Sequence, residues 1–223
     1  QGVFFTGSYE TGTKVAASFI KHFPKVVLEL GGKDPAYVCD DSPIEKTAEQ
    51  LVDGAFYNAG QSCCAVERIY VHKDCYDSFI DCFVEKAKSL VVGDPLDKST
   101  YMGPLAQKDQ VAFLAQQLTD AENQGAKVVL DGRAAFKERG GFVGPSVVLG
   151  VDHTMDIMTQ ESFGPIIGIQ KVSDDQEAIR LMNDTPFGLT ASVHTLSQKR
   201  ALDILSKVDA GTVYWNSCDR VSP

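Results

Sequence analysis

Two adjacent cysteines, Cys63 and Cys64, end the segment Gly60-Gln61-Ser62-Cys63-Cys64, which follows a predicted helix and precedes a predicted strand. A loop between rigid elements can present a thiol to a cleft, and a thiolate attacks carbonyl carbon readily. Free cysteine is also among the most buried residue types, so position alone favours a packing role. The segment therefore holds a candidate nucleophile whose alternative is a core residue.

Glu29 interrupts the apolar run Val26-Val27-Leu28, which predicts a buried strand, just before Gly31-Gly32. A carboxylate inside a buried run is costly unless it is paired, and desolvation brings it toward the range useful to a general base. A strand-end glutamate that reaches solvent or an ion pair is the alternative. We take Glu29 as the candidate base because a candidate nucleophile accompanies it.

A third segment, Glu161-Ser162-Phe163-Gly164-Pro165, precedes the apolar pair Ile166-Ile167. An acid, an aromatic ring and a Gly-Pro turn at a strand start suit a cofactor site. The Glu161 carboxylate would reach ribose hydroxyls and the Phe163 ring would lie against a flat heterocycle. The same residues also make an ordinary turn.

The elements that would position these residues alternate between helical and strand-like patterns, which predicts the α/β class. Asp41-Ser42-Pro43 predicts an N-cap followed by a first-turn proline. The flexible pair Gly31-Gly32 is the one plausible domain boundary. We expect strands at 3–5, 26–28, 68–71, 127–130, 146–149, 166–172, 191–194 and 212–215, and helices at 11–22, 44–60, 76–91, 108–123, 174–183 and 197–208.

Composition excludes several function classes. The formal charge of -9 argues against nucleic-acid and anionic-membrane partners. We find neither a membrane-spanning apolar run nor a signal peptide. The six cysteines and four histidines lack zinc-ligand spacing, so we expect no metal site, and free thiols indicate a cytoplasmic location. Gln1 leads straight into a strand, so we expect a longer parent protein.

Taken together, the segments resemble the motifs of the aldehyde dehydrogenase superfamily. Leu28-Glu29-Leu30-Gly31-Gly32-Lys33 is similar to its glutamate motif, and Gly60-Gln61-Ser62-Cys63 to its cysteine motif. The segment from Glu161 to Pro165 is similar to its cofactor-contacting motif, and Phe5-Thr6-Gly7-Ser8 to the turn that approaches the dinucleotide pyrophosphate. Further matches follow in the family's order over the whole chain: Asn183, Pro186-Phe187-Gly188-Leu189, Gly211-Thr212-Val213 and Asn216.

The resemblance implies an NAD(P)-dependent oxidation of a small-molecule aldehyde to a carboxylic acid. Cys63, not Cys64, would form a thiohemiacetal and then a thioester, which water activated by Glu29 would hydrolyse. The resemblance implies contacts to NAD or NADP from Gly7, Ser8, Leu30, Gly31, Gln110, Glu161 and Phe163. The lysine often found three residues after Gln110 is Phe113 here, which departs from the pattern.

The implied fold is an aldehyde-dehydrogenase-type catalytic domain with a mostly parallel sheet, over residues 31–223 and truncated at its C-terminus. Residues 1–30 would be the C-terminal part of a Rossmann-like dinucleotide-binding domain. The family's oxyanion asparagine is expected before Gln1, and a tunnel and oligomerisation segment after Pro223. The full-length protein would be a homodimer or homotetramer. Arg220, at the substrate mouth, would favour an anionic semialdehyde or be a solvated arginine.

Three other functions compete with this one. A papain-like cysteine hydrolase would need histidine and asparagine partners and a tryptophan after the cysteine, where Cys64 stands. In a CoA-acylating or phosphorylating aldehyde dehydrogenase, Glu29 is less expected as a deacylating base. The third alternative is a truncated module that folds but does not turn over.

Overall fold

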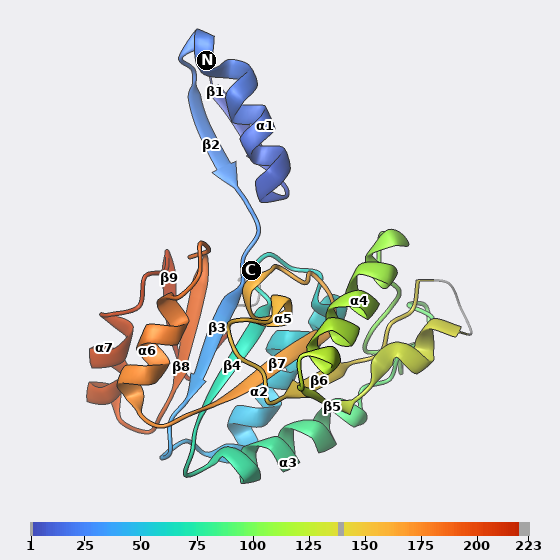
Figure 1. The fold of residues 1–223 in the computed structure, drawn as a ribbon, viewed down its shortest axis with the longest axis vertical. Helices are drawn as coiled ribbons and strands as arrows, with labels where there is room; N and C mark the ends of the chain where they lie inside the picture. Colours follow the sequence, from blue (N-terminus) through green and yellow to red (C-terminus); the bar gives the residue numbers. More distant parts are fainter. Residues whose placement is uncertain (1, 138–140, 219–223) are drawn as a thin grey trace.

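A mostly parallel sheet forms the body of the molecule. The computed structural model describes residues 2–137 and 141–218. The main sheet has seven strands in the order β5-β6-β7-β4-β3-β8-β9, and β5 runs antiparallel to β6 while the other pairs are parallel (Figure 1). The expected α/β class with a mostly parallel sheet is confirmed.

The elements follow the predicted order closely. The main-sheet strands are β3 (Asp34–Val38), β4 (Val66–His72), β5 (Lys127–Leu130), β6 (Ser146–Leu149), β7 (Ile166–Val172), β8 (Thr190–His194) and β9 (Thr212–Trp215). The helices of the body are α2 (Ile44–Phe56), η2 (Tyr57–Gly60), α3 (Tyr76–Lys88), α4 (Asp109–Asn123), η3 (Gly132–Lys137), α5 (Asp156–Thr159), α6 (Asp175–Asn183) and α7 (Gln198–Leu205). Helices α2 and α3 pack together on one face of the sheet, and α6 and α7 lie on the other (Figure 1). Among the described residues, no helix is long and apolar enough to cross a bilayer.

A small unit at the start of the chain stands away from this body (Figure 1). It consists of β1 (Gly2–Thr6), α1 (Tyr9–Phe19), η1 (Ile20–His22) and β2 (Lys25–Glu29), and β1 pairs with β2 in parallel. The prediction of a buried strand here is wrong, because Val26 is 38% exposed and Val27 is 42% exposed. The two-stranded sheet has only α1 against it, so its apolar side chains meet no second layer within the described residues.

The central strand β3 has no counterpart among the predicted strands. Its burial is complete, since all five residues are buried between β4 and β8. This strand is difficult to predict from the sequence, because Pro35 lacks an N–H donor and a proline argues against a central strand. Here the register shifts between Asp34 and Pro35, and pairing with β8 begins only at Ala36, so the missing donor falls at an irregularity.

The two ends of the parallel strands carry different kinds of residue. The segments before β3, β4 and β7 contain the three motifs, so all three meet at the amino edge of the sheet. At the carboxyl edge the predicted helix cap is wrong. Pro43 itself is the N-cap of α2, and the Ser42 hydroxyl instead donates to the carbonyl of His194, 2.5 Å away.

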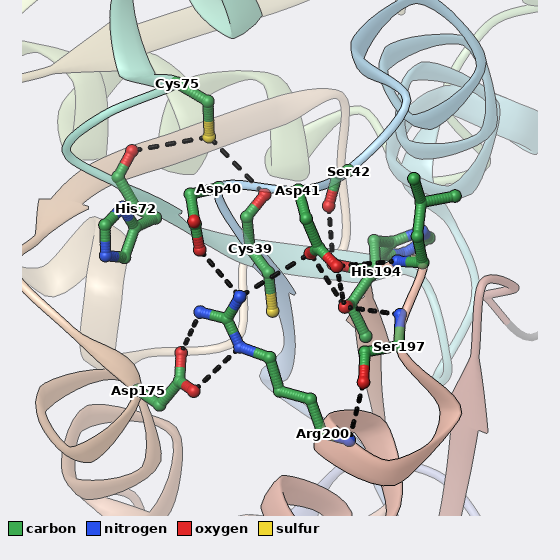
Figure 2. Close-up of polar contacts among 12 residues, drawn as sticks. Cys39, Asp40, Asp41, Ser42, His72, Cys75, Asp175, His194, Ser197 and Arg200 are labelled. Carbon is green, nitrogen blue, oxygen red and sulfur yellow. Dashed lines mark hydrogen bonds and ion pairs between the residues drawn. The ribbon is translucent and has the colours of Figure 1, made fainter.

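An ionic cluster centred on Arg200 lies at the carboxyl edge of the sheet (Figure 2). The guanidinium of this α7 residue donates to both carboxylate oxygens of Asp175, at 2.6 and 2.8 Å, and to Asp40 at 2.6 Å. Tyr37 also donates to Asp175. The hydrogen bond from Arg200 lowers the pKa of Asp40. Burial raises the pKa of Asp175, but the hydrogen bonds from Arg200 and Tyr37 outweigh it and lower the pKa overall. The cluster thus fastens α6 and α7 to the end of β3.

We predict that Arg200→Gln lowers the free energy of unfolding by about 1–3 kcal/mol at neutral pH, because it removes charged hydrogen bonds to two partly buried carboxylates. Carboxyls with a lowered folded-state pKa stabilise the protein above their unfolded value of about 4 and lose that effect as pH falls. The deficit should therefore shrink below about pH 4. Urea unfolding across pH measures it, with Lys199→Gln as the charge-matched control. A deficit that stays constant with pH would contradict the assignment.

Candidate active site

The three motifs touch one another through glycines. A Cβ atom on Gly31 would overlap the carboxylate of Glu161, and one on Gly32 would overlap the carbonyl oxygen of Cys63. The Gly32 N–H donates to Glu161 Oε1 at 3.2 Å. Gly60, with a φ of 69°, lies so close to the Gly164 carbonyl that a side chain would not fit. Segments far apart in the sequence therefore form one site at the amino edge of the sheet.

A buried ion pair holds this arrangement. Lys33 is completely buried and Glu67 is 3% exposed, and the Lys33 ammonium lies 2.7 Å from Glu67 Oε2. The same carboxylate accepts the backbone N–H groups of Ser162 and Phe163, each at 2.8 Å. Lys33 also donates to the Ser162 hydroxyl at 3.0 Å. Burial lowers the pKa of Lys33, and Glu67 opposes that shift. One pair thus joins β3, β4 and the third motif.

Two further side chains support the loop. Arg68 is completely buried, and its Nε–H donates to the Lys33 carbonyl at 2.7 Å while its terminal nitrogens donate to the carbonyls of Leu181 and Met182. Gln110 donates its side-chain amide to the Ser162 carbonyl. The sequence assigned Gln110 to the cofactor, whereas its amide nitrogen here supports the backbone of the third motif.

The two cysteines differ in environment. Cys63 is exposed and Cys64 is buried, where its sulfur lies 3.3 Å from the Ser62 hydroxyl and 3.9 Å from the Tyr57 hydroxyl. Partial burial of the sulfur, followed by the adjacent Cys64, raises the pKa of the Cys63 thiol. The residues before the loop are strained: Asn58 and the buried Ala59 have φ values of 50° and 56°. Such strain at non-glycine residues clusters at functional sites.

Glu29 and its neighbours occupy the end of β2. The Glu29 side chain is exposed, so the burial expected from the sequence is not found, and among the contacts of the described residues none joins it to Cys63. Leu30 packs against Gly12 of α1. The Gly7 N–H donates to the Glu29 carbonyl at 3.1 Å, and Ser8 caps α1 by accepting from the Thr11 N–H. Gly7 and Ser8 therefore begin a helix, whose N-terminus attracts anions such as a pyrophosphate.

The cofactor-motif residues form an open face. Glu161 lies on Gly31 and Gly32, and burial, followed by the charge of Glu67, raises its pKa. Phe163 is 38% exposed with a φ of 48°, a conformation held by its N–H bond to Glu67. Phe163 is therefore partly open to contact with a flat partner. Arg220 lies outside the described residues.

Sequence reasoning missed Glu67, and it quoted Lys33 without giving it a role. Two adjacent charged residues at the start of an apolar strand, Glu67 and Arg68, are a signal of buried pairing that could have been used. What the sequence could not supply was the partner, because Lys33 and Glu67 are 34 residues apart and meet only when β3 and β4 pair.

Comparison with known proteins shows the family to which the chain belongs. The model of the aldehyde dehydrogenase family matches residues 1–223, and the chain belongs to that family. It is 41% identical over 217 residues to an aldehyde dehydrogenase of Paenarthrobacter nicotinovorans, covering 97% of this chain and 47% of that protein.

Solved structures share the fold. An NADP-dependent glyceraldehyde-3-phosphate dehydrogenase from Bacillus halodurans, complexed with NADP, superposes with a TM-score of 0.93 at 34% identity, covering 100% of this chain and 45% of that one. A Staphylococcus aureus betaine aldehyde dehydrogenase in complex with NAD+ gives 0.93 at 30% identity, covering 98% and 44%. The chain thus spans about half the length of the relatives it matches.

We predict that Glu67→Gln lowers the free energy of unfolding by about 3–5 kcal/mol, because it leaves the Lys33 ammonium buried without its counter-charge. The loss should shrink as pH rises, since a lysine with a lowered folded-state pKa destabilises the fold most when it must stay protonated. Asp203→Asn, in the exposed pair with Lys207, is the control and should cost about 0.5 kcal/mol or less. Equal losses in the two variants would show that breaking the buried pair costs no more stability than breaking an exposed one.

Proposed function

We propose that the whole protein containing this chain oxidises an aldehyde to a carboxylic acid with NAD or NADP, using Cys63 as the nucleophile and Glu29 as the general base. The observation that carries the proposal is the contact between the three motifs at Gly31, Gly32 and Gly60. These contacts bring the loop that carries the exposed Cys63 together with the Glu161–Pro165 segment and with the segment that follows Glu29. Family membership and the cofactors of the compared structures support it.

The residues present fit a dinucleotide. Gly7 and Ser8 at the start of α1 would hold the pyrophosphate, because helix N-termini bind anions. The Glu161 carboxylate would accept from ribose hydroxyls, Phe163 would offer its ring, and Leu30 and Gly31 would border the same face. When bound, the cofactor supplies a hydride acceptor. We assign Gln110 to supporting this face through the Ser162 carbonyl.

The chain's own residues supply the remaining steps. The Cys63 thiolate adds to the aldehyde carbon to give a thiohemiacetal, whose oxyanion is stabilised by the Cys63 backbone N–H. Loss of hydride from that carbon leaves a thioester on the sulfur. Glu29 then takes a proton from water, the resulting hydroxide displaces the sulfur, and the carboxylic acid leaves. Because its raised pKa disfavours the thiolate, Cys63 needs a neighbouring base or positive charge in order to ionise near neutral pH.

The chain covers about half of the whole protein's expected length, in two parts. We assign residues 1–30 to a dinucleotide-binding domain and 31–223 to the thiol-bearing domain, in a cytoplasmic homodimer or homotetramer. Because the chain is about half as long as its relatives, we expect the 223 residues alone to turn over negligibly. Micromolar NAD affinity of the isolated chain, measured by calorimetry, would contradict that expectation.

Within the whole protein, Cys63→Ala should abolish both dehydrogenase and ester-hydrolysing activity, because both need the nucleophile. Cys64→Ala should retain much of both, since Cys64 is buried against Ser62 and Tyr57. The measurement is the steady-state formation of NAD(P)H and of acid from an ester. Equal losses in the two variants would make the assignment within the pair wrong.

Glu29→Gln keeps the shape and hydrogen-bonding capacity of the side chain but removes the base. The whole protein should still form one equivalent of NAD(P)H quickly and then stall as the thioester, with a steady-state rate lower by ~10²–10⁴-fold. Stopped-flow absorbance with intact-mass detection of the acyl group on Cys63 measures both. Turnover at the unmodified rate would exclude Glu29 as the base. A missing burst would show that Glu29 instead activates or positions the thiol.

A further inference from the structure

Asp34 is a buried acid beside the cysteine loop, and the mechanism above does not use it. It is the first residue of β3 and is 3% exposed. Its partner across the sheet is Val66 of β4, three residues after Cys63. A carboxyl group so poor in solvent is expected to have a partner or a task.

The carboxyl of Asp34 and the backbone of Cys63 converge on the same glycine. A Cβ atom on Gly32 would lie 2.8 Å from Asp34 Oδ1, and it would overlap the Cys63 carbonyl oxygen. The other carboxylate oxygen, Oδ2, accepts from the Thr190 hydroxyl at 2.6 Å. One oxygen of Asp34 therefore lies at Gly32, where the Cys63 backbone also packs, and the other is bonded to β8.

The charges nearest Asp34 act on it in opposite directions, because Glu67 raises its pKa and Arg68 lowers it. Glu67 is paired with Lys33, and Arg68 donates to the Lys33 carbonyl. Burial raises the pKa of Asp34 to about 7, although the hydrogen bonds from Thr190 oppose the shift. Partial burial and Cys64 are the main causes of the raised Cys63 pKa, and the charge of Asp34 adds to them. Asp34 also lines a small cavity together with Thr190 and Phe187, and the charged residues Lys33, Arg68 and Asp209 border the same cavity.

We propose that Asp34 is a positioning residue whose charge state sets the reactivity of the Cys63 thiol. This inference rests on the proposed role of Cys63 as nucleophile. With its proton in place, Asp34 adds no negative charge beside the thiolate. Once it has lost that proton, its charge repels the thiolate, and Cys63 ionises only at higher pH. Asp34 acts through the thiol and touches no substrate.

The test is the rate at which iodoacetamide alkylates Cys63, followed by peptide mass spectrometry that separates Cys63 from Cys64. In the unmodified protein, the logarithm of the rate should rise with pH, flatten around neutral pH as Asp34 ionises, and then rise again. In Asp34→Asn it should rise without the flattening. The rate ratio of variant to unmodified protein should be near one at about pH 5.5 and about three- to tenfold at about pH 8.5, the size of one partly screened charge.

Thr190→Val provides a second, independent variant. It removes a donor that favours the ionised carboxylate, so the flattening should move to higher pH without disappearing. A purely structural role for Asp34 would change the rate by the same factor at every pH. A constant ratio, or an unmodified profile without flattening, would overturn the inference. If Asp34→Asn fails to fold in a thermal melt, the unmodified profile and Thr190→Val still decide.

Alkylation needs neither cofactor nor turnover. A protein that shows the flattening but oxidises no aldehyde would therefore refute the proposed function and leave this inference standing. A protein that oxidises aldehydes through Cys63 but shows no flattening would support the proposed function and refute the role of Asp34.

Discussion

The buried pair between Lys33 and Glu67 is the interaction on which the site depends. Burying two charges is expensive, and their attraction compensates only when the remaining hydrogen-bonding groups are also satisfied. Here the Glu67 carboxylate accepts from Lys33, Ser162 and Phe163. The pair therefore holds β3, β4 and the Glu161–Pro165 segment together. The hydrogen bond from the Phe163 N–H to Glu67 also helps to hold Phe163 in its left-handed conformation.

The placement of the site follows from the direction of the strands. In a parallel sheet the segments that precede the strands gather at one edge, and those that follow them gather at the other. Open α/β sheets usually bind ligands at the carboxyl edge. In this chain the thiol, the two glycines and the Glu161 loop all precede strands, so the candidate chemistry lies at the amino edge. The carboxyl edge instead carries the Arg200 cluster (Figure 2).

Much of this could be predicted from local sequence. Periodicity predicted β7 and β9 with their observed bounds, and the motifs indicated which segments meet. The failures have physical causes. Strand β3 was hidden by Pro35, whose missing donor falls at a register shift. The predicted N-cap at Ser42 was wrong because the Ser42 hydroxyl donates to the carbonyl of His194, which lies 152 residues further along the chain. Burial of β2 was inferred from composition, but a strand is buried only where a second layer covers it. The partners of Lys33 and Asp34 likewise depend on strand pairing, which no local pattern contains.

The separation of the two sheet edges has a consequence for engineering the protein. Enzymes commonly lose activity when they are stabilised, because the changes stiffen the groups that must move or store strain. In this fold the strained residues Ala59 and Phe163 lie at one edge, while the clamp around Arg200 lies a strand length away at the other. Thermostabilising substitutions among the loops that follow β3, β7 and β8 would act on the fold without altering the backbone around the thiol. Substitutions that raise the stability of the fold can thus be placed at a different edge of the sheet from the candidate thiol.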